Sequence, residues 1–92
     1  MKAQKKPVII DFFSINPDTP LHSIERWVEG FGDDFKNNFQ VDYNDTFIHL
    51  KVKTLEGTSY DVTPEDVIIR GIKGEYYPCK KDVFEQTYEV LQ

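Results

Sequence analysis

The stretch from residue 70 to residue 81 gathers the side-chain types that bind phosphorylated ligands. It holds four cations and two tyrosines: Arg70, Lys73, Tyr76, Tyr77, Lys80 and Lys81. Cations form charge-assisted hydrogen bonds with phosphate, and aromatic faces stack on bases. Trp27 is a further candidate stacking face. The alternative is a solvated hairpin whose lysines bind nothing, with one of the two tyrosines packed in the core because alternate residues of a strand face opposite sides.

Nucleophilic catalysis would need Cys79 beside His22 or His49, because a nucleophile requires a base within hydrogen-bonding reach. Cys79 follows a proline at the end of an aromatic strand, where cysteine usually packs as a small apolar residue. His49 alternates outward with two lysines and is typical of a solvated surface. Two separated histidines and one thiol match no zinc-ligand spacing. The sequence therefore predicts no catalytic residue and no metal site.

The acidic pairs Asp33-Asp34 and Glu65-Asp66 fall in expected turns, where carboxylates usually accept local hydrogen bonds. The segment Gly71–Gly74 has too few glycines for a phosphate loop and precedes no helix. These patterns predict neither acid-base catalysis nor a cofactor, and we do not expect an enzyme.

Charge limits the range of partners. The net charge is -5, yet residues 1–6 and residues 70–81 each carry +3, which leaves -11 on the rest of the 92 residues. An acidic chain with local basic segments disfavours long nucleic acid, while a compact basic patch suits one small anion. No apolar run is long enough to span a membrane. We expect a soluble, cytoplasmic protein.

The length of 92 residues favours a single domain that spans residues 1–92. Cys79 is the only cysteine, so no disulfide within the chain stabilises the core. The β-branched and aromatic run 7–13 predicts a first strand. Thr19 as N-cap, with Pro20 at the first helical position, predicts a helix. Its apolar stripe follows helical spacing to the glycines at 30 and 32: Leu21, Ile24, Trp27, Val28 and Phe31.

Period-two alternation then predicts a hairpin from residue 39 to residue 53, turning at Asn44-Asp45. A turn at 55–58, a strand at 58–62, a turn at 63–66 and strands at 67–72 and 75–79 follow. Gly74 can supply the positive φ of the last tight turn. Asp82 with Glu85 resembles a capping box, which predicts the start of a helix. Phe84, Tyr88 and Leu91 have helical spacing and give this last helix an apolar stripe. The pattern predicts an α+β fold: an antiparallel β-meander or small, partly open barrel of 5–6 strands, with one helix after the first strand and one C-terminal helix.

The closing segment VIIRGIKGEYYPCKKDVFEQTYE, residues 67–89, resembles a signature of small phage and prophage proteins of unassigned function, commonly GDWIIRGVKGEFYPCKPDIFEKTYE. The opening KKPVIID, residues 5–11, is similar to their KKPVVIEA start. The two stretches cover about a third of the 92 residues. Glu65 stands where that family usually has glycine, and Lys81 where it usually has proline. These departures bear on the preceding turn and on the start of the last helix.

The resemblance implies a phage-encoded accessory protein that acts in the cytoplasm of a bacterial host cell. We expect a non-catalytic binding protein, an anti-defence inhibitor that sequesters a nucleotide signal or binds a host protein. Homo-oligomerisation would help to form a ligand pocket, because clefts often lie between subunits. The alternative is a phage structural or assembly module that packs against another phage protein.

Overall fold

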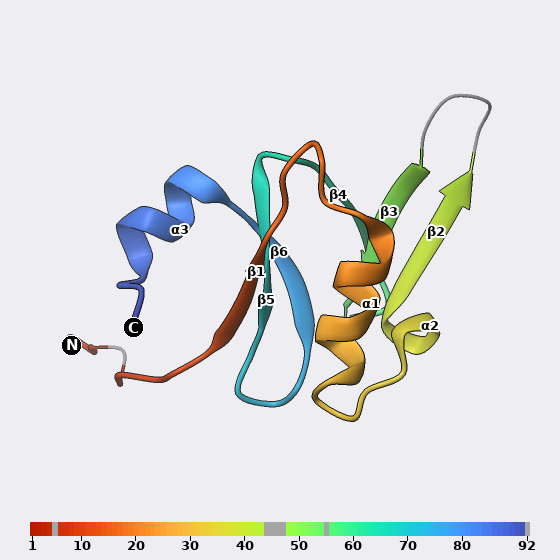
Figure 1. Cartoon of the computed structure of the whole chain (residues 1–92). Coiled ribbons are helices and arrows are strands. Elements are labelled where there is room, and N and C mark those ends of the chain that lie inside the picture. Colours follow the sequence, from red (N-terminus) through yellow and green to blue (C-terminus); the bar gives the residue numbers. More distant parts are fainter. Residues whose placement is uncertain (5, 44–47, 55, 92) are drawn as a thin grey trace.

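A computed structural model describes residues 1–4, 6–43, 48–54 and 56–91. Within these residues the chain forms six strands and three helices (Figure 1). The elements in chain order are β1 (Asp11–Ser14), α1 (Leu21–Glu29), α2 (Phe35–Asn38), β2 (Phe39–Tyr43), β3 (Ile48–Lys53), β4 (Ser59–Val62), β5 (Asp66–Arg70), β6 (Tyr76–Lys80) and α3 (Lys81–Thr87).

The strands form two antiparallel three-stranded sheets. Sheet A has the order β1-β5-β6 and sheet B the order β2-β3-β4. This confirms the predicted α+β class with antiparallel strands, and the strands do not close into a barrel within the described residues. Sheet A is not a simple meander, because its edge strand β1 joins β5 from the far end of the chain, with Asp11 opposite Arg70.

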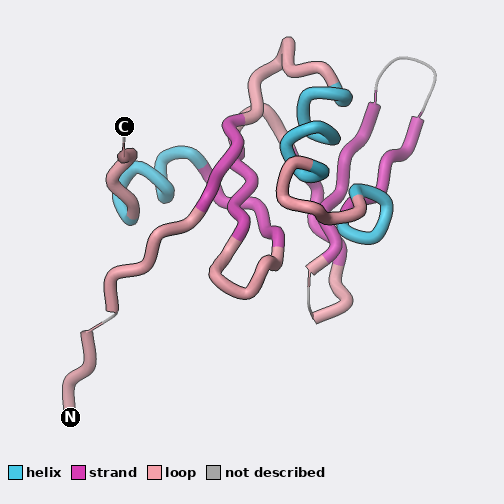
Figure 2. Tube along the Cα trace, turned by 60° about the horizontal axis from the view of Figure 1, so that its bottom comes forward, coloured by secondary structure: helices cyan, strands magenta, loops and turns pink. Residues whose placement is uncertain are grey.

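The first strand is shorter than predicted, because its partner ends. Asp11 pairs with Arg70, the last residue of β5 before the hairpin turn. Residues 7–10 therefore have no β5 residue opposite them and continue as an arm that leaves the sheet. Figures 1 and 2 show this arm running away from the body of the molecule.

Helix α1 confirms the predicted apolar stripe, with Ile24 and Val28 buried. Its N-cap prediction is wrong by one residue, since Pro20 is the N-cap. Thr19 instead closes the preceding loop, where its Oγ1 accepts the amide of Asn16 at 2.9 Å. The short helix α2 was not predicted, because its four residues are too few to show a period.

Helix α3 also departs from its predicted cap. Lys80 is the N-cap and makes no side-chain capping bond, whereas Asp82 lies within the first turn and accepts the amide of Val83 at 2.8 Å. The capping box with Glu85 is therefore wrong. The helix ends at Thr87. The predicted stripe holds at the buried Phe84 and at Tyr88, whose ring stacks on it just beyond the helix, whereas Leu91 is exposed.

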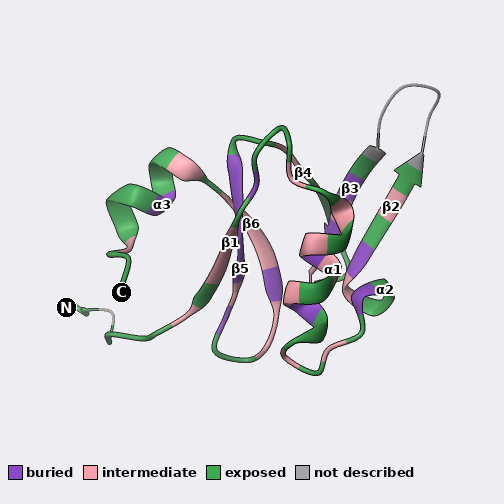
Figure 3. Ribbon diagram, viewed as in Figure 1, coloured by how far each residue is buried: buried purple, intermediate pink, exposed green. Residues whose placement is uncertain are grey.

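Two apolar clusters lie on opposite faces of sheet A. Figure 3 shows that β5, the central strand of this sheet, is buried along most of its length. The inner cluster fills the space between the two sheets and the first two helices: Ile15, Ile24, Val28, Phe35, Phe39, Leu50, Val52, Ile68 and Tyr76. The outer cluster of Val67, Ile69 and Phe84 lies beneath α3. Strand β5 contributes to both, so it is the only strand of sheet A whose apolar residues are buried on both faces within the described residues.

The predicted turn at Asn44-Asp45 lies outside the described residues. Of the 55–58 turn, Leu55 also lies outside them, and Gly57 has a φ of 82°. Within the described part of the chain, none of the helices is both long and apolar enough to span a bilayer.

Candidate functional site

The β5–β6 hairpin carries most of the predicted site residues, and its turn is held by several hydrogen bonds. Gly71 donates its amide to Glu75 O at 2.8 Å, and Gly74 donates to Gly71 O at 3.0 Å. Gly74 has a φ of 78°, which confirms the predicted left-handed position. We call residues 71–75 the hairpin tip.

The side chain of Glu75 folds back over its own turn. Its Oε2 accepts the amide of Lys73 at 2.9 Å. Its carboxylate also occupies the space beside Gly71, where an added Cβ would overlap it. Glycine at position 71 therefore lets the carboxylate lie flat against the backbone. This contact fixes the shape of the tip and does not involve the side chains of residues 72 and 73.

An ion pair and a phenol buttress the base of the tip. Asp33 Oδ2 accepts Arg70 Nε at 3.1 Å and the Tyr76 hydroxyl at 2.6 Å. Arg70 and Tyr76 are opposite each other in the β-ladder, so one carboxylate clamps both strands. The Arg70 guanidinium also lies over the ring of Phe31, 4.6 Å from its centroid.

This arrangement shifts the titration of the groups involved. The hydrogen bond from Tyr76, together with the guanidinium of Arg70, holds the pKa of Asp33 below its usual value. Burial, followed by the hydrogen bond to Asp33, raises the pKa of Tyr76. Both shifts keep a neutral phenol donating to a charged carboxylate, which is the arrangement of a structural clamp.

Sequence reasoning missed Asp33. The adjacent pair Asp33-Asp34 suggested local hydrogen bonds, and Asp34 does cap α2 by accepting the amide of Lys36 at 2.9 Å. Only one of two adjacent carboxylates can cap a helix in this way, which leaves the other available for a distant partner. That signal could have singled out Asp33, although it would not have named Arg70 and Tyr76.

The aromatic candidates are engaged within the fold. Tyr76 is 1% exposed, and Trp27 packs edge-on against it with ring centroids 5.8 Å apart. Trp27 also contacts Phe13 and Phe31. Tyr77 is half-buried on the outer face, where burial and a hydrogen bond with Tyr88 raise its pKa. Packing of one tyrosine and partial exposure of the other agrees with the expected alternation.

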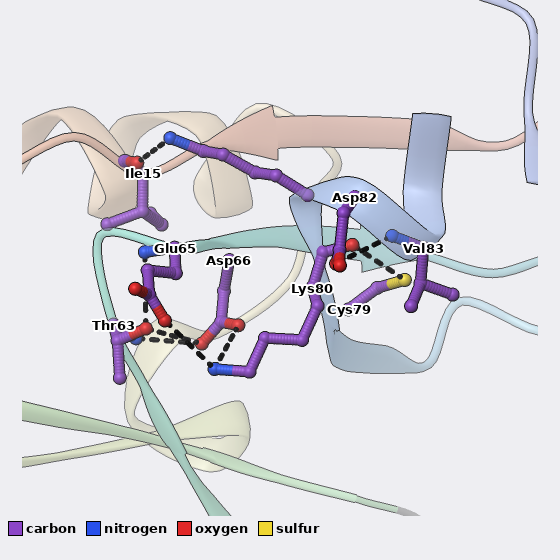
Figure 4. Close-up of polar contacts among 9 residues, drawn as sticks. Ile15, Thr63, Glu65, Asp66, Cys79, Lys80, Asp82 and Val83 are labelled. Carbon is purple, nitrogen blue, oxygen red and sulfur yellow. Dashed lines mark hydrogen bonds and ion pairs between the residues drawn. The ribbon is translucent and has the colours of Figure 1, made fainter. Parts of the chain in front are cut away.

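Lys80 and Lys81 lie at the opposite end of β6 from the tip. Lys80 Nζ is 3.2 Å from Asp66 Oδ1 and 3.9 Å from Glu65 Oε2. Figure 4 shows the Lys80 side chain reaching toward both carboxylates. Lys81 Nζ donates to Ile15 O at 2.6 Å and to Asn16 Oδ1 at 3.2 Å. Both cations therefore serve contacts between elements.

The four predicted cations do not converge. Arg70 and Lys80 are separated by the length of β6, about 13 Å for a strand that rises about 3.3 Å per residue. Arg70, Lys80 and Lys81 each contact a group of the chain itself. Lys73, at the tip, enters no ion pair within the described residues. Among the described residues, Lys73 is therefore the one of these four cations whose side chain makes no ion pair or hydrogen bond that holds it to the fold.

The tip also exposes a large apolar side chain. Ile72 is 69% exposed, immediately before Lys73. Beside the base of the tip lies a hollow of about 290 Å³, lined by Thr54, Glu56, Tyr60, Glu75, Tyr76 and Tyr77. The tip and this hollow form one continuous candidate surface at the ends of β5 and β6.

The candidate catalytic groups remain apart. Cys79 packs against the outer cluster, and burial raises the pKa of its thiol, which disfavours the reactive thiolate. His22 and His49 are both exposed. No group of three or more metal-binding side chains occurs in the described part of the chain.

Comparisons with known proteins add no assignment to this geometry. Protein-family models, curated proteins and solved structures were each compared with the chain, and none of them matches it.

Proposed function

We propose that this chain is a non-catalytic binding protein that docks on another protein through the hairpin tip. The observation that carries the proposal is the pair Ile72 and Lys73, an exposed apolar side chain beside an exposed cation, on a turn whose backbone is already fixed. Apolar anchors in rigid settings carry much of the binding energy of protein interfaces.

The contacts beneath the tip support this role. The amides of Gly71, Lys73 and Gly74 are all satisfied inside the turn, and Asp33 clamps its base. A turn that is ordered before binding loses little conformational entropy on binding. The sequence thus places its glycines and carboxylates in the scaffold and leaves only residues 72 and 73 facing outward.

The partner chemistry follows from these two side chains. Ile72 requires an apolar socket, and Lys73 requires a carboxylate at its rim. The neighbouring hollow, with the exposed Tyr60 on its border, can receive a protruding side chain of the partner. Capture of a nucleotide signal has less support, because phosphate would need the cations that are dispersed or engaged with Asp33, Asp66 and Ile15.

The resemblance to small phage and prophage proteins supports a bacterial host protein as the partner, in the manner of an anti-defence inhibitor. A phage assembly protein as the partner is the alternative, and it would use the same surface. The two differ only in where the partner is encoded.

The test is affinity capture with tagged protein from bacterial lysate, with and without phage infection, followed by calorimetry with the purified partner. We expect a partner that binds the wild type, binds the double variant Ile72→Asp/Lys73→Glu at least tenfold more weakly, and binds Val83→Asp normally. Val83 is a matched control because it is an exposed apolar residue on α3.

A captured protein that binds both variants equally would overturn the tip as the docking surface. Calorimetric heat with cyclic or linear nucleotides, lost on Arg70→Ala or Lys73→Ala, would support ligand capture instead. Recovery of the partner only from infected cells, with its sequence encoded by the phage, would favour the assembly role.

A further inference from the structure

The edge of sheet A that carries the arm is open. Among the described residues β1 pairs only with β5, and Ile15 donates its amide to Asp66 O on that side at 3.1 Å. Backbone groups alternate along a strand, so those of Phe13 and Asp11 also face β5. The groups of Phe12 and Ser14, and of Ile10 just before the strand, therefore face outward, where no strand among the described residues pairs with them.

The arm beside this edge is apolar and exposed. Ile9 is 80% exposed, and Val8 is exposed as well. A groove of about 310 Å³ runs between residues 8–12 and residues 84 and 88–91. Its lining is mostly apolar, and its two charged residues, Asp11 and Glu89, are both acidic. Neither of them enters an ion pair within the described residues.

The occupant that fits this groove is a strand that is apolar and carries a cation, and the arm itself has that character. Lys6 precedes Pro7 and Val8, and within the described residues it has no ion pair. We propose that two copies of the chain associate by antiparallel pairing of residues 6–12, with the two-fold axis at Ile9. The proposal is independent of the proposed function, which uses the β5–β6 hairpin tip and not the free edge of β1.

This register satisfies the backbone of both copies. Val8 of one copy lies opposite Ile10 of the other, and Lys6 lies opposite Phe12, so the outward-facing groups of Ile10 and Phe12 gain partners. Pro7 falls opposite Asp11, at a position whose N–H would point away from the second copy. The proline of the arm thus costs no hydrogen bond in this pairing.

The same register satisfies the side chains. Phe12 and Ile10 pack with the outer cluster beneath α3, and cross-strand neighbours share a face. Val8 and Lys6 of the second copy therefore enter the groove beside them, with Lys6 near the carboxylate of Glu89. The two Ile9 side chains meet on the axis and shield each other from water. Two-fold symmetry forms each contact twice.

Sedimentation equilibrium of the full chain over a wide concentration range tests the pairing. We expect a mass approaching twice the 10.8 kDa of one chain, and a single-chain mass for Ile9→Asp. Ile72→Asp, a matched change of an exposed isoleucine at the hairpin tip, should stay dimeric. Ile9 is exposed and lies outside every helix and strand, so circular dichroism should show Ile9→Asp folded.

Cross-linking provides a second measurement. In a Cys79→Ala background, Ile9→Cys should form a symmetric intermolecular disulfide on mild oxidation, because non-hydrogen-bonded antiparallel pairs bring Cα atoms to about 4.5 Å. Val83→Cys in the same background should remain reduced. A single-chain mass at every concentration would overturn the proposal. So would a dimer that survives Ile9→Asp and does not cross-link through residue 9, since it would use another surface.

Discussion

At the scale of single residues, Asp33 is the polar side chain on which the candidate surface depends most. Its Oδ2 accepts hydrogen bonds from Arg70 on β5 and Tyr76 on β6, while it follows α1 in the chain. One carboxylate therefore connects three parts of the fold. Without it, the hydroxyl of the almost fully buried Tyr76 would lose its acceptor.

We expect Asp33→Ala to lower the free energy of unfolding by about 2 kcal/mol, because a charge-assisted bond is lost and a buried hydroxyl is left unpaired. Asp34→Ala removes only an N-cap of a four-residue helix and should cost about 1 kcal/mol or less. Urea denaturation of both variants measures the difference. Equal losses would contradict the clamp.

The lowered pKa of Asp33 gives this clamp a pH dependence. A carboxyl whose pKa is lower in the folded than in the unfolded state stabilises the fold above the unfolded value, here 3.8, and the gain is lost as the pH falls through the folded value. The stability advantage of the wild type over Asp33→Asn should therefore be constant above that pH and shrink below it. Thermal denaturation across the acid range checks this, and an advantage that grew on acidification would contradict it.

At the scale of elements, local patterns predicted what local interactions determine. Alternation of apolar and polar residues identified β2 and β3. Gly74 predicted the tight turn at the tip, because a positive φ is a local requirement of the turn. The cap of α3 was mispredicted because the helix begins at Lys81, directly after β6, and not at Asp82. The side chain of Lys81 donates a hydrogen bond to Ile15 O, which holds the start of the helix beside β1. The sequence cannot show that contact, since its two residues lie far apart in the chain.

The candidate site divides in the same way. A tight hairpin rich in cations and tyrosines was predictable, whereas the fate of each cation was not. Asp33 and Asp66 decide which cations are paired, and Asp33 reaches its partners only through the tertiary fold. Residue types therefore indicated a basic surface, and the fold left Lys73 as the one of the four cations without a side-chain partner among the described residues.

The two turn glycines permit a matched experiment on the tip. Gly74 and Gly57 have nearly equal φ values, 78° and 82°, so alanine at either position should cost about 1 kcal/mol of backbone strain. A Cβ at Gly74 would also lie 3.2 Å from an Arg70 nitrogen, whereas none of the described atoms lies within 4 Å at Gly57. We expect Gly74→Ala to destabilise more in urea denaturation and to weaken partner binding, and Gly57→Ala to leave binding unchanged. The reverse order would contradict the rigid-tip interpretation.

At the scale of the whole molecule, the division into two sheets was beyond sequence reasoning. The strand patterns predicted that strands pair with their neighbours in chain order. Instead β1 pairs with β5, and β2, β3 and β4 form a separate sheet. Local alternation carries no information about which distant strand completes a sheet. The two apolar clusters then follow from sheet A having covered faces on both sides.

These clusters should respond differently to truncation. Ile68→Ala opens a cavity in the cluster shared by both sheets and should cost about 3 kcal/mol, with amide protection lost throughout. Phe84→Ala removes the main anchor of α3 and should expose α3 amides while β2 and β3 keep their protection. Hydrogen exchange detected by mass spectrometry measures both. A uniform loss of protection in Phe84→Ala would contradict this division.

The pairing of Asp11 with Arg70 also sets an order of events during synthesis. A ribosome that adds about 5–20 residues per second leaves β1 waiting some seconds for the strand that completes its ladder. Until then, the apolar side chains of β1 have no sheet to pack against. The growing polypeptide then avoids aggregation only if chaperones bind it or if translation reaches β5 quickly. Slowing translation between codons 14 and 66 should therefore lower the yield of native protein more than slowing it after codon 80.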